Sequence, residues 1–362
     1  MKTTIRLGAV AAASALLLAA CASAPEEDPA ATDGTNTATE TETPAESVDF
    51  KACMVSDSGG FDDKSFNQSA YEGLKRAESE LGIEIATAES TSNSDFGPNL
   101  EVQVDAGCDL IITVGFLLST ATVESALANP DVHYAIIDDL ADNNYDGEID
   151  APNIKPITFE TDEAAFLAGY AAASATGSGT VGTFGGMDIP SVTIFMDGYQ
   201  AGVDYYNEQN GGDVSVLGMT SFSESFEDQT AGKNLTQGQL DQGADIIMPV
   251  AGPVGLGAAA AIQAAGDSWL IGVDSDWTLT APDYADIVFT SVLKNIANSV
   301  FDTIKTTITD GFSTDPYVGT LENEGVGVAD FAEGTVSDDV LAELDTIKAG
   351  IIAGDIEASA AE

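Results

Sequence analysis

Residues 54–82, MVSDSGGFDDKSFNQSAYEGLKRAESELG, contain one structural unit of the fold in a single stretch. A short apolar run ends at Gly59-Gly60, two aspartates and a Phe-Asn pair follow, and apolar residues then recur at helical spacing up to Gly82. This order predicts a strand that passes through a glycine turn into an amphipathic helix. The glycines favour a tight turn, and they would also let the backbone approach a ligand.

The same order of strand and helix recurs along the chain. Further apolar strands are predicted at 83–90, 108–115, 133–138 and 154–160, and a second series follows at 179–186, 245–252, 269–277 and 286–295, with helical segments between them. Continuous apolar strands that alternate with helices are typical of a parallel sheet covered on both faces. A body of about 310 residues from Val48 onward is suited to two such lobes. The sequence therefore predicts an α/β fold with two Rossmann-like lobes.

The N-terminal segment has the features of a bacterial lipoprotein signal. Lys2 and Arg6 precede an apolar run over 7–20, which is too short to span a bilayer, and Leu18-Ala19-Ala20-Cys21 resembles a lipobox. An ordinary secretory signal with an incidental cysteine is the alternative. Residues 21–47 are rich in Thr, Ala, Pro and acids, a composition that predicts a disordered tether. We expect a signal peptide over 1–20 and a protein attached to the outer face of the cell membrane only through the lipid on Cys21.

The charge of the chain limits its partners. The net charge is −49, from 60 acidic and 11 basic residues. So acidic a surface repels nucleic acid and anionic lipid headgroups, and no nucleic-acid partner is expected.

A catalytic or metal site is not expected either. The single histidine, His133, has no nucleophile partner that the sequence identifies, and a Ser-His-Asp triad would depend wholly on it. Asp62 and Asp63 are adjacent, so we expect exposed acids at a helix start rather than an acid–base pair. One histidine and two remaining cysteines offer no metal-ligand cluster, and no cofactor is expected. These cysteines, Cys53 and Cys108, either pair or stay as buried free thiols.

Ligands of open parallel sheets bind beyond the carboxyl ends of the strands, and polar or glycine residues occupy those ends here. They are Asp57–Gly60, Gly115-Phe116, Asp138-Asp139, Gly185-Gly186, Gly252 and Asp274–Asp276. Two sheets that face each other would bring these ends into one interlobe cleft. Lys294 follows an apolar strand at a lobe junction of a lysine-poor chain, and it either faces solvent or meets a ligand or an interlobe acid.

Six segments resemble, in the same order, the basic membrane protein family of PnrA-like nucleoside-binding lipoproteins. They are MVSDSGGFDDKSFNQSAYEGL, ITVGFLLSTAT, NPDVHYAIID, FETDEAAFLAGYAAA, ADIIMPVAG and IGVDSDW. The resemblance implies a type I periplasmic-binding-protein fold with a three-segment hinge, one lobe formed by 48–159 and 293–318 and the other by 160–292 and 319–360. It also implies a monomer that delivers a purine nucleoside to an ABC permease and its ATPase.

The resemblance assigns roles to residues of the predicted cleft. It implies that Phe66 stacks on the base beside Asn67, that Asp138 reads the base edge, and that Gly252, Asp274 and Lys294 hold the ribose. Asp57, Gly60 and Phe116 are further contacts from the loops. For the second stacking aromatic the pattern favours Phe226, with Phe222 and Trp277 as alternatives. A sugar or another small polar solute, a surface receptor or adhesin without transport, and a nucleoside-cleaving enzyme remain alternatives in function.

Overall fold

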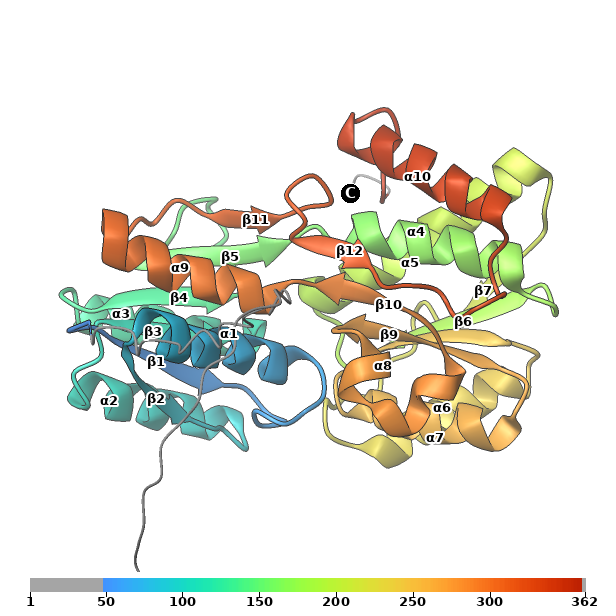
Figure 1. The fold of residues 1–362 in the computed structure, drawn as a ribbon. Helices are drawn as coiled ribbons and strands as arrows, with labels where there is room; N and C mark the ends of the chain where they lie inside the picture. Colours follow the sequence, from blue (N-terminus) through green and yellow to red (C-terminus); the bar gives the residue numbers. More distant parts are fainter. Residues whose placement is uncertain (1–47, 360–362) are drawn as a thin grey trace, which may run out of the picture. The chain divides into compact units, whose positions relative to one another are not determined.

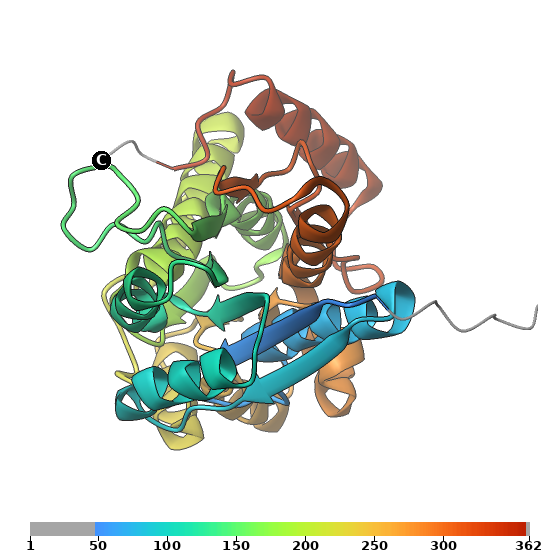
Figure 2. The same ribbon diagram turned by 90° about the vertical axis from the view of Figure 1, so that its left-hand side faces the viewer.

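The computed structural model describes residues 48–359. The predicted signal peptide, Cys21 and the predicted tether lie outside these residues. The described chain forms two six-stranded sheets, each covered by helices (Figures 1 and 2). We call each sheet with its helices a lobe.

The first sheet has the strand order β11-β5-β4-β3-β1-β2, and its described strand pairs are all parallel. Its strands are β1 (Lys51–Ser56), β2 (Glu84–Ala88), β3 (Leu110–Val114), β4 (His133–Ile137), β5 (Ile154–Phe159) and β11 (Tyr317–Gly319). The helices around it are α1 (Phe66–Leu81), α2 (Phe96–Asp105), α3 (Ser119–Ala128) and α9 (Ile296–Asp310). Helix α1 packs against α9, and α2 packs against α3.

The second sheet has the order β12-β10-β9-β8-β6-β7. Its strands are β6 (Thr180–Gly185), β7 (Ser215–Leu217), β8 (Ile246–Val250), β9 (Trp269–Asp274), β10 (Val288–Lys294) and β12 (Val326–Val328). Its helices are α4 (Thr161–Ala175), α5 (Pro190–Asn210), α6 (Gln229–Leu240), α7 (Val254–Ala265), α8 (Trp277–Thr280) and α10 (Asp338–Ile352). Strand β12 pairs antiparallel with β10, which departs from the expected parallel order. It reaches β10 from the other lobe through a short loop, so no crossover helix sets its direction.

The chain passes between the sheets at three places: from β5 to α4, from β10 to α9, and between β11 and β12. Strand β10 stays in the second sheet up to Lys294, two residues beyond the boundary expected at residue 292. The last residue of β10 therefore lies where one lobe passes into the other.

The alternation of side chains along β1 shows why both faces of the first sheet are covered. Ala52 and Met54 belong to the apolar cluster that includes the inner faces of α1 and α9, whereas Cys53 and Val55 belong to the cluster that includes α2 and α3. Successive strand residues point to opposite faces, so a strand that is apolar throughout needs helices on both sides. At Gly73 of α1, an added Cβ would collide with the backbone carbonyl of Ala297, so glycine is what lets α9 approach.

Cys53 and Cys108 form a disulfide with a Cα–Cα distance of 5.9 Å. Cys53 lies in β1 and Cys108 lies two residues before β3, the strand beside β1. Of the two states left open by the sequence, the structure contains the paired one.

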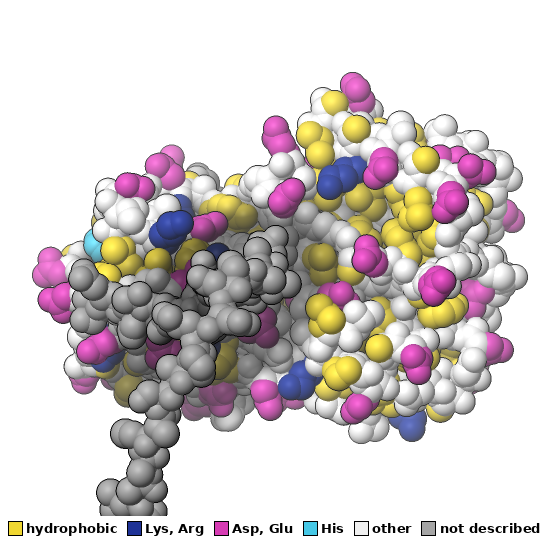
Figure 3. Space-filling model, viewed as in Figure 1, with side chains coloured by type: hydrophobic (Ala, Val, Ile, Leu, Met, Phe, Trp, Pro, Cys, Tyr) yellow, Lys and Arg dark blue, Asp and Glu magenta, His cyan; other side chains and the backbone are white. Residues whose placement is uncertain are grey.

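Acidic side chains are scattered over the face seen in Figure 3, with few lysine or arginine side chains between them. No helix within residues 48–359 is long and apolar enough to cross a membrane.

Candidate ligand-binding site

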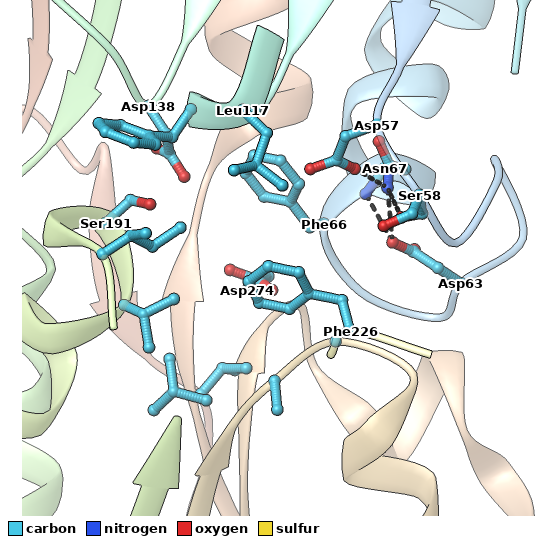
Figure 4. A pocket seen from close by; sticks show the side chains of 18 of the residues that line it. Asp57, Ser58, Asp63, Phe66, Asn67, Leu117, Asp138, Ser191, Phe226 and Asp274 are labelled. Carbon is cyan, nitrogen blue, oxygen red and sulfur yellow. Dashed lines mark hydrogen bonds between the residues drawn. The ribbon is translucent and has the colours of Figure 1, made fainter. Parts of the chain in front are cut away.

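A cavity lies where the carboxyl ends of both sheets meet (Figure 4). Asp57 and Asp138 reach it from strand ends of the first sheet, and Gly252 and Asp274 reach it from strand ends of the second. Its volume is about 60 Å³. A dry cavity of about 150 Å³ in another protein holds benzene, so a ligand larger than benzene requires the lobes or side chains to move apart here.

Two phenylalanine rings reach this cavity from different lobes (Figure 4). Phe66 is the first residue of α1, and Phe226 lies in the loop before α6. Both side chains are half-buried, and both line the cavity. The arrangement provides two separate aromatic surfaces for a flat ligand.

Lys294 and Asp138 form a buried ion pair across the two lobes. The ammonium nitrogen lies 2.5 Å from Oδ2 of Asp138, and the two side chains are 3% and 7% exposed. Burial raises the pKa of the Asp138 carboxyl, and the charge of Lys294 opposes that rise. The ammonium also lies 5.1 Å from the centroid of the Phe66 ring, within cation–π range.

Asn67 joins two buried carboxylates at the other end of the cavity. Its side-chain nitrogen donates to Oδ1 of Asp57 at 2.8 Å and to Oδ2 of Asp63 at 3.2 Å. Its side-chain oxygen is buried and has no hydrogen-bond partner among the described residues. Burial raises the pKa of Asp57 to about 8, so this carboxyl is largely protonated at neutral pH.

Asp63 holds the start of α1 in place. Its carboxylate accepts hydrogen bonds from the backbone nitrogens of Ser65, Asn67 and Gln68 at 2.9, 2.9 and 3.0 Å. The expectation that Asp63 is an exposed acid is therefore wrong: it is 4% exposed because it satisfies these backbone donors.

Asp274 is the last residue of β9 and is 8% exposed. Its Oδ2 accepts a hydrogen bond of 2.5 Å from the hydroxyl of Ser65, and Ser275 donates to the carbonyl oxygen of Lys64 at 3.1 Å. Burial is the main cause that raises the pKa of Asp274 to about 6, and Lys294 opposes it. Asp276, which the sequence places at the same strand end, instead caps α8 by accepting from the backbone nitrogen of Thr278 at 2.9 Å.

The structure places most of the predicted ligand contacts on the cavity wall. They are Asp57, Phe66, Asn67, Phe116, Asp138, Phe226, Gly252, Asp274 and Lys294. Gly60 lies outside the wall, because its α-carbon faces the carboxylate of Glu89, with Oε1 3.4 Å from where a Cβ would be.

The surroundings of the three candidates for the second stacking aromatic show which of them can contact a ligand in the cavity. Trp277 is 1% exposed in the core of the second lobe, where its ring nitrogen donates to the carbonyl oxygen of Val273 at 3.1 Å. Phe222 packs against Gly185 and does not line the cavity, which leaves Phe226 on the wall. His133 stacks on Phe312 with ring centroids 4.2 Å apart, at the first residue of β4 and thus away from the carboxyl end.

Sequence reasoning missed the contribution of α5 and the residue before it. Ile189, Ser191, Val192 and Phe195 line the cavity. A glycine-ended strand followed by proline at the first turn of a helix was the available signal, since such a helix starts at the carboxyl edge of its sheet. Within residues 48–359, no group of three or more His, Cys, Asp or Glu side chains is arranged to hold a metal ion.

Comparison with known proteins identifies the family. Residues 50–360 match the family described as ABC transporter substrate-binding protein, PnrA-like. The chain belongs to this family. It is 36% identical over 311 residues to basic membrane protein A of Borreliella burgdorferi, covering 83% of this chain and 85% of that one. It is 33% identical over 286 residues to the ABC transporter nucleoside-binding protein BmpA of Lactococcus lactis, covering 76% and 74% of the two chains.

Solved structures agree with the fold. An ABC transporter solute-binding protein from Aeropyrum pernix superposes with a TM-score of 0.75 at 27% identity, covering 85% of this chain and 92% of that one. A solute-binding protein from Agrobacterium vitis, with a TM-score of 0.59 at 16% identity, shares the fold over 82% of this chain and 98% of its own. The chain is thus a substrate-binding protein of an extracytoplasmic ABC transporter family, with the type I periplasmic-binding-protein fold expected from the sequence. The family implies a small-molecule ligand and a permease with its ATPase as partners.

Proposed function

We propose that this protein captures a purine nucleoside in the interlobe cavity and presents it to an ABC importer, while a lipid on Cys21 attaches it to the membrane. The observation that carries the proposal is the pair Phe66 and Phe226, which reach one cavity from different lobes. A base stacked between two aromatic rings gains about 1–3 kcal/mol by analogy with single-stranded nucleic acids. The name of the Lactococcus lactis relative supports a nucleoside as the ligand class.

The polar groups of the cavity suit the two halves of a nucleoside. Asp274 lines the same cavity as the two phenylalanine rings with a buried carboxylate, a group that accepts hydrogen bonds from neighbouring ribose hydroxyls. The unpartnered oxygen of Asn67 would accept a hydrogen bond from a base N–H group. Gly252, with φ 53°, offers backbone close to the ligand without a side chain. Lys294 would donate a hydrogen bond to the ribose, and Asp138 would bind the edge of the base.

Binding requires the lobes to open first. The cavity of about 60 Å³ is too small to admit a nucleoside as it stands. The three segments that join the lobes form the natural hinge, since rotation there separates Phe66 from Phe226 without unfolding either sheet. Closure around the ligand would then supply both aromatic surfaces at once.

The test is thermal unfolding of the purified protein against adenosine, guanosine, inosine, the free bases, pyrimidine nucleosides and ribose. A ligand at 100 times its dissociation constant adds about 2.7 kcal/mol to the free energy of unfolding. We expect purine nucleosides to raise the melting temperature by a few degrees and ribose to leave it unchanged. Stabilisation by ribose or another sugar alone would refute the nucleoside assignment.

Two further assays separate transport from the other functions. Incubation with inosine, followed by chromatography, should recover the intact nucleoside, whereas release of free base would indicate a cleaving enzyme. Deletion of the gene should abolish uptake of labelled nucleoside. Unchanged uptake would favour a receptor or adhesin that has no part in transport.

A further inference from the structure

A second cavity adjoins the first at one end. In Figure 4, Asp138 and Ser191 lie on one side of the first cavity, and Asp57 and Asn67 lie on the opposite side. Asp138 and Ser191 also line the second cavity. Its volume is about 380 Å³, several times that of the first. The second cavity is therefore a continuation of the same cleft beyond Asp138.

The residues that line only the second cavity include three carboxylates, Asp139, Asp142 and Glu160. Lys294 is the one base on its wall, and its ammonium already pairs with Asp138. The hydrogen-bond donors to Asp139 and Asp142 are neutral: Asp139 accepts from the hydroxyl of Ser119, and Asp142 accepts from the backbone nitrogens of Asp146 and Gly147. The second cavity thus has a net negative charge that its own wall does not balance.

Three aromatic residues also line the second cavity. Phe159 is buried, Phe116 is half-buried, and Tyr145 is 87% exposed. Leu140, also on this wall, is 56% exposed. The Phe159 ring already has the Lys294 ammonium 5.4 Å from its centroid, so Phe116 and Tyr145 are the rings left for a ligand. An aromatic face beside carboxylates attracts a cation more strongly than either group does alone, because the ring quadrupole and the negative charges act in the same direction.

We propose that the second cavity is a subsite for a positively charged substituent on the bound nucleoside, such as a protonated amine on a short alkyl chain. The inference rests on the proposed function, because the first cavity must hold the nucleoside. A substituent that leaves the nucleoside at the Asp138 end enters the second cavity directly, since both cavities share that residue. A phosphate at the same place would meet Asp139, Asp142 and Glu160, so the same wall disfavours nucleotides.

The experiment compares calorimetric dissociation constants of adenosine with those of derivatives that carry an aminobutyl or a butyl group, attached at N6 or at the 5′ position. The butyl compounds have the same chain without the charge. We expect the amine to bind roughly three- to tenfold tighter than the butyl compound at one of the two positions, as for a partly exposed charge pair. The preference should shrink as salt is raised from 20 to about 500 mM.

Matched variants assign the preference to the cavity wall. Asp142→Asn should reduce the ratio of the amine's affinity to the butyl compound's affinity and leave the affinity for adenosine unchanged, because Asp142 lines only the second cavity and lies outside the segments that join the lobes. Asp267→Asn removes the same charge from an exposed site outside both cavities and should leave the ratio unchanged.

Each other outcome has one meaning. Equal binding of amine and butyl compounds at both positions, with adenosine bound normally, overturns the subsite and leaves the nucleoside assignment standing. An equal effect of the Asp142 and Asp267 variants also overturns it, because the preference for the amine would then come from the general surface charge. Failure of adenosine, guanosine and inosine alike to bind overturns the proposed function and, with it, this inference.

Discussion

The hydroxyl of Ser65, directly before α1, donates a hydrogen bond of 2.5 Å to Oδ2 of Asp274 at the end of β9. Ser65 belongs to the first lobe and Asp274 to the second, and the bond from Ser275 to the carbonyl of Lys64 crosses in the opposite direction. Neither serine lines the ligand cavity. The closed arrangement of the lobes is therefore held partly by the protein's own groups.

Replacement of Ser65 by alanine should strengthen ligand binding although Ser65 does not line the cavity. The arrangement of the lobes in this structure, whose cavity is too small for a nucleoside, loses one cross-lobe hydrogen bond worth about 0.5–1.5 kcal/mol, so opening becomes easier and the affinity should rise roughly two- to twelvefold. Calorimetry with the best nucleoside measures the change. Ser299→Ala is the control, because that buried hydroxyl donates to Ile296 within its own helix. Equal affinities of the two variants would show that the Ser65 bond does not contribute to closure.

Removal of either cavity phenylalanine should weaken ligand binding with little effect on folding. Phe66→Ala and Phe226→Ala each lose one stacking surface, which predicts a loss of about 1–3 kcal/mol, roughly 5- to 150-fold in affinity. Both rings are half-buried, so the melting temperature of the unliganded protein should change little. Phe222→Ala, at a half-buried ring outside the cavity wall, should keep its affinity. A Phe66→Ala protein that unfolds far below the wild type would identify this ring as core.

Substitutions of Lys294 and Asp138 should have non-additive effects on the free energy of unfolding, because the two side chains form one buried ion pair. Lys294→Met leaves the buried Asp138 carboxylate without its cation, which should cost about 3–5 kcal/mol in the free energy of unfolding. Adding Asp138→Asn to that variant removes the uncompensated charge and should recover most of the loss. Urea denaturation of the single and double variants measures this. If the double variant is as unstable as Lys294→Met, the damage comes from lost packing around the lysine chain instead of lost charge.

Because the pKa of Asp57 is raised in the folded protein, we expect the free energy of unfolding to decrease as the pH rises. Its carboxyl titrates near 3.8 in the unfolded chain and at about 8 in the folded protein, because burial disfavours the charged form. Between these values the folded state holds a proton that the unfolded state has lost. The contribution is therefore fully present below pH 3.8 and is lost as the pH rises to about 8. Asp274, with its pKa raised to about 6, acts in the same direction.

Calorimetric melting of the unliganded protein from pH 5 to pH 8 tests whether its stability decreases as the pH rises. The melting temperature should decrease across this range, and Asp57→Asn should flatten the decrease because the amide carries no titratable proton. Asparagine also keeps an oxygen that can accept the hydrogen bond from Asn67. Parallel curves for the two proteins would show that Asp57 is not the group that titrates.

Much of the site was predictable because it follows from sheet topology. Parallel strands all end at one edge, so Asp57, Asp138 and Asp274 were expected together from their positions after apolar runs. Phe226 could be preferred over Trp277 only by its resemblance to a family pattern. The structure gives the physical reason, since Trp277 fills the core beside Gly272 and Gly255.

The remaining features depend on how elements far apart in the sequence approach each other. The pairing of Lys294 with Asp138 joins residues 156 positions apart in different sheets, and no local pattern specifies it. Phe195 is part of the buried face of α5, and helical periodicity does not distinguish a core residue from one at a cavity. For Gly60 the sequence could not distinguish a turn that faces a ligand from one that, as here, faces Glu89, because a glycine turn before a helix has the same pattern in both cases.

Because β11 and β12 come late in the chain, neither sheet can be completed until most of the protein has been synthesised. Each sheet receives an edge strand from residues 317–328, after every other strand has been made. A ribosome that has not yet released this segment therefore holds two unfinished lobes, and domains that fold during synthesis normally need their whole set of strands. A chain built in this order can reach its native state only near the end of translation.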